Sequence, residues 1–560
     1  MRYLVTSALP YINGVKHLGN LAGSMLPADV YARFLRARGR NVLFICATDE
    51  HGTPAELAAA EAGLSVSEYC RREHTIQADV CGEFGLSFDH FGRSSSEENR
   101  ELTQHLARKL ELNGFLEERS MRQLYSPKDG RFLPDRYVIG KCPHCGYAAA
   151  RGDQCESCTR VLDPSDLIDP CSVISGSPDL ELRETKHLFL LQSKLVGQLR
   201  SWIKSHTDWP GLVTSIALKW LDEGLKDRCI TRDLKWGVPV PREDFEGKVF
   251  YVWFDAPIEY MSATAEWAAR DPGNRDWKSW WERTDDVRYV QFMAKDNIPF
   301  HTIGFPSTIL GSGEPWKLVD FIKGFNWLTY YSDKFSTSRK RGVFMDQALK
   351  LLPADYWRYY LIASAPESGD ADFSWKTFAA TVNADLADNF GNFVNRTLKF
   401  LASKFGPTIP RLSSPSVSDE ALLTALAGGV KEYTGHLEKL QFRKAVNELR
   451  SIWSLGNNFL NRRAPWKGIK TDPAEASDVL FTAVNLIRIY AVLAAPIIPH
   501  VSEKVFFALR LTESELEWPE NIQCELTRVN DGRAFDVPDP LFQRISEEQV
   551  ELWEREFAGT

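Results

Sequence analysis

Residues 2–52 read RYLVTSALPYINGVKHLGNLAGSMLPADVYARFLRARGRNVLFICATDEHG, and this stretch decides the fold. Two runs rich in β-branched and apolar residues, 2–8 and 41–47, predict strands. The residues between them follow a helical pattern that stops at Gly39. A strand, a crossover helix and a second strand form a βαβ unit, which predicts a parallel sheet with ligands at the carboxyl ends of its strands.

The rest of the chain divides by its apolar pattern. Residues 248–254 and 287–293 predict further strands of the same sheet. Residues 382–509 read as helical throughout, and a run rich in Ser and Pro at 407–418 joins two of the helices. One apolar stripe supports this helical prediction, because its members recur at intervals of three to five residues: Leu386, Phe390, Phe393, Val394, Leu398, Leu401 and Phe405.

The composition is that of a soluble globular protein, with 560 residues, 44% hydrophobic and 25% charged. The N-terminus lacks a signal-peptide pattern, and no uncharged apolar run approaches eighteen residues, so we expect a cytoplasmic protein without a membrane span. The net charge of −8 argues against indiscriminate polyanion binding. The balance is uneven, however: residues 381–470 hold 13 Lys and Arg against 7 Asp and Glu, whereas residues 471–560 hold 7 against 17.

Two Cys-x-x-Cys pairs stand out among the ten cysteines, which are too few for a disulfide scaffold. The pairs are Cys142 with Cys145 and Cys155 with Cys158. Four thiolates complete the tetrahedral shell of a zinc ion and leave no open position. We therefore expect one structural Zn²⁺ that folds a segment too small to hold itself together. A redox pair or chance clustering is the alternative.

Two further patterns lie after predicted strands. Lys16-His17-Leu18-Gly19-Asn20 opens the first crossover helix, and a helix N-terminus with such side chains suits an anion. Taken alone, a His near a helix start is more often a cap or a surface residue. The second pattern, Lys334-Phe335-Ser336-Thr337-Ser338-Arg339, lies in a polar stretch after the second half of the sheet.

Together, these patterns resemble the two signatures of the class I aminoacyl-tRNA synthetases, and among them those of the methionyl-tRNA synthetase family. HLGN stands where the family usually has HLGH, and KFSTS where it has KMSKS or KFSKS. ATDEHGTP, the four-cysteine knuckle, ITRDLKWGVPVP, YVWFDAPIEYM, KDNIPFH and APW are also similar, and they follow the family's order over residues 1 to about 470. So many motifs in register make a chance resemblance negligible.

The resemblance implies an α/β Rossmann-like catalytic domain, split by an inserted zinc-knuckle domain and followed by an α-helical bundle that binds the anticodon. We expect six divisions: the first half of the catalytic domain, the inserted domain with its knuckle at 142–158, the second catalytic half, the KFSTS-loop region, the bundle and an acidic helical tail. Their ranges are 1–113, 114–228, 229–325, 326–381, 382–525 and 526–560.

The resemblance also implies the reaction. L-Methionine and ATP, with Mg²⁺, would give methionyl-adenylate and pyrophosphate, and the methionyl group would pass to the 3′ terminal adenosine of initiator and elongator tRNA(Met). The catalytic residues would be His17, Asn20, Lys334 and Thr337. The residues that bind ATP would be Lys16, His17, Gly19, Asn20, Asp296, Lys334, Ser336, Ser338 and Arg339.

For the amino acid, the resemblance implies that Asp49 binds the ammonium group and that Arg232 holds Asp49 in place, since an isolated buried carboxylate is costly. A surface Asp at a strand end is the plainer interpretation of Asp49. A thioether favours an apolar wall with polarizable aromatic faces. The residues expected in this wall are Ala8, Leu9, Tyr11, Trp253, Ala256, Pro257, Tyr260, Phe300 and His301. Core packing alone is expected to account for about half of them.

The resemblance places anticodon recognition in the helical domain, on Asn392, Arg396 and Trp466. Asn392 and Arg396 are one helical turn apart, on the face away from the apolar stripe. Amide and guanidinium groups that read base edges, with an indole that stacks on a base, are typical of single-stranded RNA recognition. A polar helix face and a core Trp are the alternative. We expect a tRNA affinity that is selective and sensitive to salt.

The chain departs from the family pattern at Asn20 and Thr337, which replace a histidine and a lysine. Loss of one charge-assisted contact at Thr337 would cost roughly 1.5–3 kcal/mol, and Arg339 and Lys340 are candidates to replace it. Two alternatives to an active enzyme of this family remain. One is a catalytically weak paralogue that acts as a tRNA-binding or regulatory protein, and the other is a synthetase for leucine, isoleucine, valine or cysteine. The first three enzymes generally carry longer insertions, and the cysteine enzyme typically has zinc in its amino-acid pocket. Because the chain ends soon after the bundle, we expect a monomer.

Overall fold

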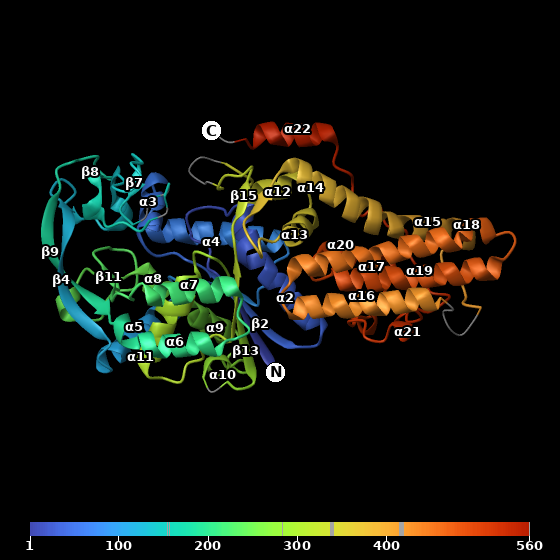
Figure 1. Ribbon diagram of the computed structural model, residues 1–560, viewed down its shortest axis with the longest axis horizontal. Coiled ribbons are helices and arrows are strands. Elements are labelled where there is room, and N and C mark those ends of the chain that lie inside the picture. Colours follow the sequence, from blue (N-terminus) through green and yellow to red (C-terminus); the bar gives the residue numbers. More distant parts are fainter. Residues whose placement is uncertain are drawn as a thin grey trace.

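The structure is a computed structural model that describes residues 1–153, 155, 157–158, 160–282, 284–335, 341–413 and 419–558. At its centre is a parallel sheet of five strands in the order β14-β13-β1-β2-β3 (Figure 1). The two N-terminal strands are neighbours in parallel register, with Arg2 opposite Asn41, so the predicted βαβ unit is confirmed. The strands are β1 (Arg2–Ser7), β2 (Asn41–Thr48), β3 (His90–Arg93), β13 (Val287–Ala294) and β14 (Phe321–Phe325).

The two faces of the sheet enter two different apolar cores, because successive side chains of a strand point to opposite sides. Val5 and Phe44 join the core that contains helix α2 (Leu26–Ala37) and continues into the C-terminal bundle. Leu4 and Leu43 join the opposite core. The helices packed on that second face include α5 (Glu97–Leu112), α6 (Val196–Ser205), α7 (Gly211–Asp222), α9 (Glu259–Ala269) and α11 (Phe305–Ser312).

Further helices surround the sheet. Helix α4 (Val66–Glu83) begins at a capping box in which Ser65 and Glu68 exchange hydrogen bonds. Two helical segments, Leu21–Met25 and Phe300–Gly304, have π-helical geometry, which is often found at functional sites. The remaining helices of this half are α1 (Leu18–Asn20), α3 (Thr53–Glu61), α8 (Val252–Asp255), α10 (Lys278–Trp281), α12 (Met345–Leu351) and α13 (Ala354–Ala363).

The predicted insertion at 114–228 contains two antiparallel sheets, of order β10-β9-β4-β5 and β7-β6-β8. Its last part differs from the expectation: α6 and α7 pack in the core of the parallel sheet, where Leu199 and Val213 are fully buried. The strands of the two sheets are β4 (Leu116–Ser126), β5 (Arg131–Phe132), β9 (Glu181–Leu190), β10 (Arg228–Cys229), β6 (Val138–Lys141), β7 (Ala150–Arg151) and β8 (Ile168–Ser172).

The prediction of a central-sheet strand at 248–254 is wrong. Only β12 (Val249–Phe250) is extended there, and it pairs antiparallel with β11 (Thr231–Arg232) in a separate ribbon. Residues from Val252 onward are helical and continue into α9. A short apolar run suits a buried helix as well as a strand, and here tertiary packing selects the helix. A second small ribbon joins β15 (Leu328–Tyr330) to β16 (Ala371–Phe373).

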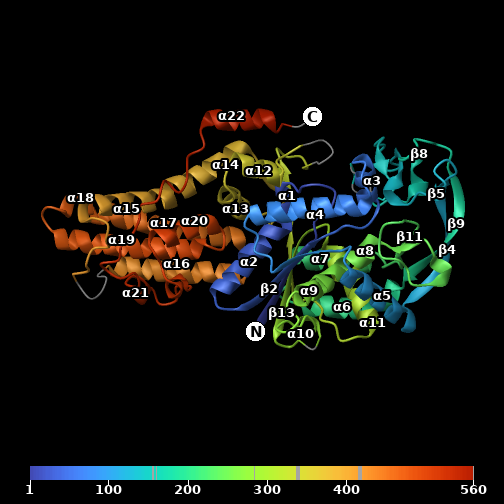
Figure 2. The ribbon, with the colours of Figure 1, turned by 180° about the vertical axis from the view of Figure 1, so that it is seen from behind.

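The C-terminal part is an elongated helical bundle beside the sheet, as Figure 2 shows from behind. The predicted apolar stripe is confirmed, because all its members are fully buried except Phe405, which is partly buried. A π-helical segment, Asn383–Gly391, joins the first two helices. The helices are α14 (Trp375–Val382), α15 (Asn392–Phe405), α16 (Glu420–Glu438), α17 (Phe442–Arg463), α18 (Pro465–Gly468), α19 (Pro473–Ala494), α20 (Pro499–Ala508), α21 (Ile522–Glu525) and α22 (Glu547–Glu556).

The acidic tail folds back along the chain. Helix α22 lies above α14 in Figure 1, and the rings of Trp553 and Trp375 are 5.0 Å apart. A fully buried ion pair joins α13 to α2: Arg358 on α13 is 2.7 Å from Asp29 on α2. Helix α19 is long and apolar enough to cross a membrane by length and composition alone, but 89% of its most apolar window is buried inside the fold. Its apolar character is therefore accounted for by the bundle core.

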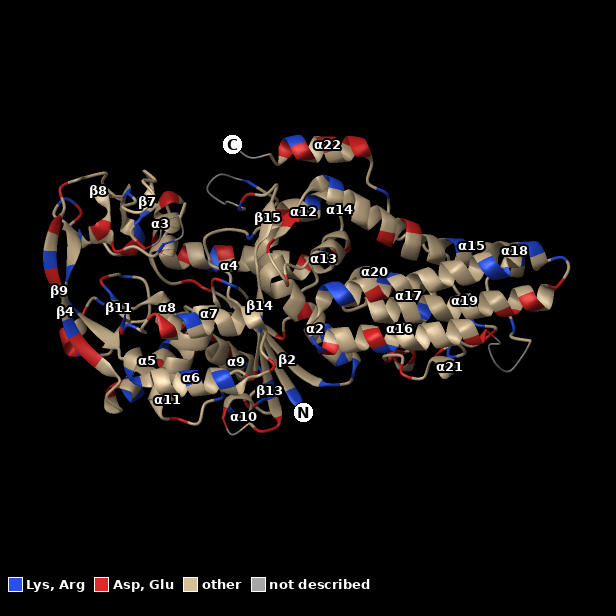
Figure 3. Ribbon diagram, in the orientation of Figure 1, with Lys and Arg blue, Asp and Glu red and all other residues tan. Residues whose placement is uncertain are grey.

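Charge follows the division expected from the sequence. Figure 3 shows Lys and Arg on the helices around α15 and α18, and mostly Asp and Glu on α22. The basic segment and the acidic tail are thus separate regions of the surface.

Candidate functional site

The two signature segments, more than 300 residues apart in the chain, meet beyond the carboxyl end of β1. The backbone N–H of Leu18 donates to Val343 O at 3.0 Å, and that of Met345 donates to Lys16 O at 2.9 Å. The ring of Phe335 stacks on the ring of His17, with centroids 4.8 Å apart. The two motifs therefore form one site.

His17 caps helix α1. Its Nδ1 accepts the backbone N–H of Asn20 at 3.2 Å, and Asn20 Oδ1 accepts the backbone N–H of His17 at 3.3 Å. Burial, with a smaller contribution from Lys16, lowers the pKa of His17 to about 3, so the imidazole is neutral. Because Nδ1 is an acceptor, the ring proton lies on Nε2 and the Asn20 amide keeps its own N–H donors. The cap interpretation and the anion-site interpretation are thus compatible.

The packing around Gly19 leaves little room for a side chain. A Cβ at this position would lie 3.0 Å from His17 Nδ1 and 3.3 Å from the Phe335 ring. Lys16, just before the cap, donates to Asn13 Oδ1 at 3.1 Å, and burial lowers its pKa to about 8. The imidazole Nε2–H of His17, the Asn20 amide and the Lys16 ammonium therefore lie within one short segment at the start of α1, and such side-chain donors suit a phosphate group.

Lys334 and Asp296 both contact Trp327, the first at the ring face and the second at the indole N–H. The Lys334 ammonium is 4.6 Å from the centroid of the Trp327 ring, and the Trp327 indole N–H donates to Asp296 Oδ1 at 3.4 Å. Ser336, Thr337, Ser338, Arg339 and Lys340 lie outside the described residues. The described part of the second signature thus contributes the Lys334 cation next to Phe335, which stacks on His17.

Asp49, directly after β2, is the prominent buried acid of the site. Its backbone pairs with the loop after β1, where Asp49 N–H donates to Pro10 O at 2.9 Å and Ile12 N–H donates to Asp49 O at 2.9 Å. The side chain is 6% exposed, and its buried Oδ1 has no hydrogen-bond partner among the described residues. Burial, and then the charges of Asp255 and Glu50, raises the pKa of Asp49 well above its usual value. A cation that reached this carboxylate would relieve both penalties.

The expected contact between Arg232 and Asp49 is wrong. Arg232 Nε instead pairs with Asp135 at 3.1 Å, and its guanidinium lies 3.7 Å from the centroid of the Tyr251 ring. The pairing follows from chain geometry, since Arg232 belongs to β11 and the β11–β12 ribbon presents it to Asp135 in the inserted segment. Arg232 therefore does not compensate the Asp49 charge, which the Lys16 charge and the His51 backbone N–H offset in part.

An aromatic and imidazole cluster faces this region from α8, α9 and the Phe300–Gly304 turn. The rings of Trp253 and Phe300 are 4.8 Å apart. His301 Nδ1 donates to Asn297 O at 2.9 Å, so His301 Nε2 accepts the Tyr260 hydroxyl at 2.8 Å. Burial lowers the pKa of His301 to about 4, which keeps the ring neutral.

The other residues expected in the wall differ in burial. Pro257 is buried, whereas Ala8, Leu9, Tyr11 and Ala256 are half-buried, and Ala8 and Leu9 pack against the second core. The wall is therefore accessible on one side and continuous with core packing on the other.

A buried polar network behind Asp49 was missed by sequence reasoning. His51 Nδ1 is 2.6 Å from Asp255 Oδ2, and Asn99 Nδ2 donates to the same oxygen at 3.4 Å. Ser262 donates to Asn99 Oδ1 at 3.0 Å. His51 and Asp255 occur in the motifs ATDEHGTP and YVWFDAPIEYM, which is the signal that could have identified them.

The four knuckle cysteines gather as predicted. Their Sγ atoms all lie within 4.8 Å of one another. Cys145 and Cys155 are 3.6 Å apart, and Cys142 and Cys158 are 3.9 Å apart. Tetrahedral Zn–S bonds of ~2.3 Å place the sulfurs ~3.8 Å apart, so this donor set fits zinc. Only a small apolar cluster lies around it, as expected of a metal-dependent fold.

The residues expected to read the anticodon lie at the far end of the bundle. The Arg396 guanidinium is 4.1 Å from the centroid of the Trp466 ring and donates to Asn461 Oδ1 at 3.0 Å. Asn392 is exposed one turn away on the same helix. Beside them is a cavity of about 370 Å³ lined by Arg396, Thr397, Phe400, Leu460, Pro465, Trp466 and Leu480. This end of the bundle therefore offers a cation and a half-buried aromatic ring together.

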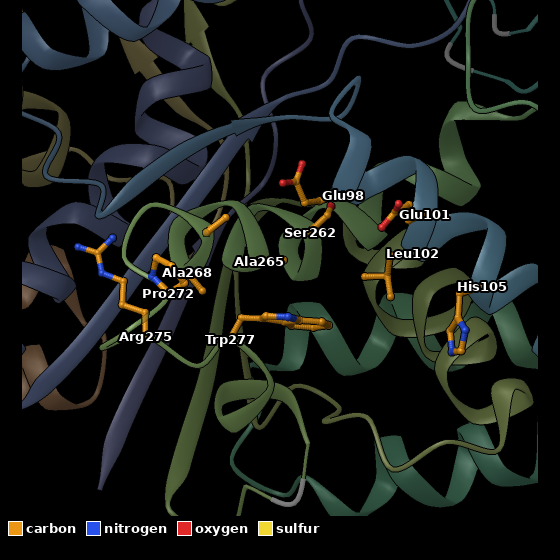
Figure 4. A pocket seen from close by; sticks show the side chains of 11 residues that line it. Glu98, Glu101, Leu102, His105, Ser262, Ala265, Ala268, Pro272, Arg275 and Trp277 are labelled. Atoms are coloured by element: carbon orange, nitrogen blue, oxygen red, sulfur yellow. The ribbon is translucent and has the colours of Figure 1, made fainter.

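A larger cavity, of about 490 Å³, lies apart from both regions between α5 and α9 (Figure 4). Glu98, Glu101 and His105 line one side of it, with Trp277 and Arg275 across from them. None of the signature or wall residues takes part in it.

A parallel α/β sheet with two converging signature segments at its carboxyl edge defines a nucleotide-binding enzyme fold of the class I synthetase kind. The family model described as tRNA synthetases class I (M) matches residues 3–398, and the chain belongs to this family. A second family model, described as the anticodon binding domain of methionyl tRNA ligase, matches residues 409–560. This match includes the acidic tail.

Curated relatives agree over the full length. The chain is 60% identical to the methionine–tRNA ligase of Streptomyces avermitilis, over all of this chain and 99% of that protein. It is 57% identical to methionine–tRNA ligase 1 of Acaryochloris marina, over the whole of both. A crystal structure of Mycobacterium tuberculosis methionyl-tRNA synthetase bound by methionyl-adenylate has the same fold, with a TM-score of 0.78, 23% identity, and coverage of 97% of this chain and 100% of that one.

Proposed function

We propose that the chain is a methionine–tRNA ligase. It activates L-methionine with ATP to methionyl-adenylate and pyrophosphate, and it transfers the methionyl group to the 3′ terminal adenosine of tRNA(Met). The observation that carries the proposal is the junction of the two signatures beside a buried carboxylate, one oxygen of which, Asp49 Oδ1, has no hydrogen-bond partner among the described residues. Full-length similarity to methionine–tRNA ligases supports it.

The amino acid enters with its ammonium group on Asp49 and its side chain against the wall formed by Trp253, Tyr260 and Phe300. The neutral His301 ring, whose Nε2 accepts the Tyr260 hydroxyl, fixes that hydroxyl in place. An apolar, polarizable wall favours a thioether over a charged or hydroxylated side chain. The ammonium site is common to all amino acids, so the wall provides the selectivity.

ATP binds across the junction of the signatures. His17 Nε2–H, the Asn20 amide and Lys16 donate to phosphate oxygens, and Lys334 neutralises charge on the leaving pyrophosphate. Asp296 holds the ribose hydroxyls. The methionine carboxylate then attacks the α-phosphorus in line, with pyrophosphate leaving on the opposite side. No protein nucleophile is needed, because positioning and charge stabilisation lower the barrier.

Arg339 and Lys340 replace the lysine that is absent at Thr337. Both follow Ser338 directly in the sequence, so they are the cations of the chain that lie closest in sequence to Thr337 after the signature. Methionine-dependent ATP–pyrophosphate exchange in Arg339→Ala and Lys340→Ala tests this assignment. We expect roughly a tenfold loss in at least one of them, and unchanged rates in both would remove it.

tRNA(Met), initiator and elongator, binds along the bundle, with Trp466 stacking on an unpaired anticodon base and Asn392 and Arg396 on base edges. Mg²⁺ accompanies ATP and offsets phosphate charge. One structural Zn²⁺ binds Cys142, Cys145, Cys155 and Cys158, and atomic spectroscopy of the purified protein should find one zinc per chain. We also propose a cytoplasmic location and the six-part division of the chain given above.

The decisive experiment is ATP–pyrophosphate exchange with each of the twenty amino acids in turn, followed by charging of initiator and elongator tRNA. We expect exchange with methionine alone and charging of both tRNAs. Exchange with another amino acid would make the chain a different synthetase. tRNA binding without any exchange would make it a binding protein.

A further inference from the structure

Two arginines stack on aromatic rings in or beside the wall of the site, and they differ in whether a carboxylate pairs with them. Arg232 lies 3.7 Å from the centroid of the Tyr251 ring and is paired with Asp135. Arg228 lies 4.5 Å from the centroid of the Trp253 ring and 5.6 Å from that of Phe300. Among the described residues, no carboxylate lies within ion-pairing distance of the Arg228 guanidinium and no hydrogen bond from it is found. The closest charge-stabilising contacts of the Arg228 guanidinium are thus the faces of the Trp253 and Phe300 rings.

Burial makes this arrangement energetically significant. The Arg228 side chain is half-buried, and burial lowers its pKa. A cation–π contact strengthens when water is excluded from it, and an unpaired guanidinium in such a place has few other ways to recover its solvation. The Trp253 and Phe300 faces are therefore held to the guanidinium more firmly than an exposed pair would be.

The three groups come from three separate parts of the chain. Arg228 belongs to β10, where pairing with Leu190 of β9 fixes its backbone. Trp253 lies on α8, and Phe300 opens the π-helical turn Phe300–Gly304. The guanidinium is positioned by the inserted sheet but contacts rings of the amino-acid wall. It therefore connects the inserted sheet to the surface that faces the thioether.

We propose that Arg228 is a positioning residue for the amino acid: its guanidinium holds Trp253 and Phe300 in the arrangement that packs against the methionine side chain. This inference rests on the proposed function. Arg228 acts through the rings and does not touch the reacting atoms, so it sets the affinity for methionine and leaves the rate of adenylate formation unchanged.

The test compares Arg228→Gln and Arg228→Lys in methionine-dependent ATP–pyrophosphate exchange. We expect Arg228→Gln to raise the methionine KM roughly 5- to 30-fold, the range that a desolvated cation–π contact gives. The kcat and the KM for ATP should stay within about twofold of the unmodified values. Arg228→Lys keeps a cation over the rings and should recover most of the loss.

A second readout follows the rings directly. Titration with methionine should change the intrinsic tryptophan fluorescence, and the dissociation constant of Arg228→Gln should rise by the same factor as the KM. A role limited to fold stability would lower the amount of active protein, and hence kcat, without moving this constant.

Arg275→Gln is the matched control. Its guanidinium lies 4.7 Å from the centroid of the Trp267 ring, outside the wall, so its loss should leave the methionine KM unchanged. Unchanged methionine affinity in Arg228→Gln, or a loss confined to kcat, overturns the inference. If that variant does not fold, Arg228→Lys decides: a measurable rise of about two- to fivefold in KM alone supports the role, and an unchanged KM overturns it. Absence of exchange in the unmodified chain would instead overturn the proposed function.

Discussion

In the sheet half of the molecule, several ionisable groups at and around the site are buried. Asp49 is 6% exposed, Asp29 and Arg358 are fully buried, and burial keeps the His17 and His301 rings neutral. At the far end of the bundle, the Arg396 guanidinium stacks on a half-buried Trp466, and the Arg462 side chain of the Arg462–Asp419 pair is 55% exposed. A buried charged group at the sheet interacts strongly with a ligand of opposite charge because little water competes, and this suits the selective binding of a small substrate. Exposure at the bundle suits a large polyanion that must bind and leave.

Loss of the buried Arg358–Asp29 ion pair should have the largest effect, which is on the free energy of unfolding. Arg358→Gln should lower the free energy of unfolding by about 3–5 kcal/mol, because Asp29 and four backbone carbonyls lose a buried donor. Urea denaturation measures it. A loss below about 1 kcal/mol would show that the buried pair behaves as a surface pair does.

Asp49→Asn should have the next largest effect. It should weaken methionine binding and leave tRNA binding unchanged. Removal of one partner of a buried charge pair costs about 2–5 kcal/mol, so the methionine KM should rise at least roughly 30-fold. tRNA binding, measured by filter binding, should be unchanged because the anticodon region lies elsewhere. A fall in both would mean that the two regions are not independent.

Trp466→Ala probes the exposed end. Loss of one base-stacking ring should weaken tRNA binding by about 1–3 kcal/mol, roughly 5- to 150-fold. Methionine-dependent ATP–pyrophosphate exchange should not change. Trp466→Phe keeps a ring that can stack and is the matched control. An equal loss of tRNA affinity in the two variants would argue against stacking.

The pH dependence sharpens the contrast further. Lys16 carries its charge only below its lowered pKa of about 8. A contribution of this cation to ATP binding is therefore present at pH 7 and lost as pH rises through about 8. The free energy of unfolding changes in the opposite direction. Between about pH 8 and the ordinary lysine pKa, Lys16 holds its proton in the unfolded chain but has lost it in the folded one. The free energy of unfolding therefore rises with pH over this range. In the unmodified chain, the rate of methionine-dependent ATP–pyrophosphate exchange should be roughly twofold lower at pH 8 than at pH 7. In Lys16→Arg, the rate should not change over this pH range.

The exposed pair at the bundle should matter least. Arg462 and Asp419 are 2.6 Å apart, but one partner is largely in water. Arg462→Gln should change the free energy of unfolding by about 0–1 kcal/mol and should reduce the salt dependence of tRNA binding by about one unit of slope. A destabilisation comparable to that of Arg358→Gln would erase the distinction between the regions.

The sequence predicted the elements whose pattern is local. Two β-rich runs with a helix between them gave β1 and β2, the regular stripe from Leu386 gave the bundle, and cysteine spacing gave the zinc knuckle. It did not predict features set by distant packing. The run at 248–254 became a ribbon and a helix, and Arg232 paired with Asp135. His51–Asp255 joins residues 204 apart, and no local periodicity reports such a contact.

The central claim is that the buried Asp49 carboxylate, whose Oδ1 has no hydrogen-bond partner among the described residues, receives the ammonium group of methionine. Calorimetric titration with three ligands tests it without any mutation: methionine, its analogue with an alcohol in place of the carboxylate, and its analogue without the amino group. We predict that the alcohol binds within about tenfold of methionine and that the deaminated compound binds at least roughly 30-fold more weakly. A deaminated analogue that bound as tightly as methionine would contradict the account.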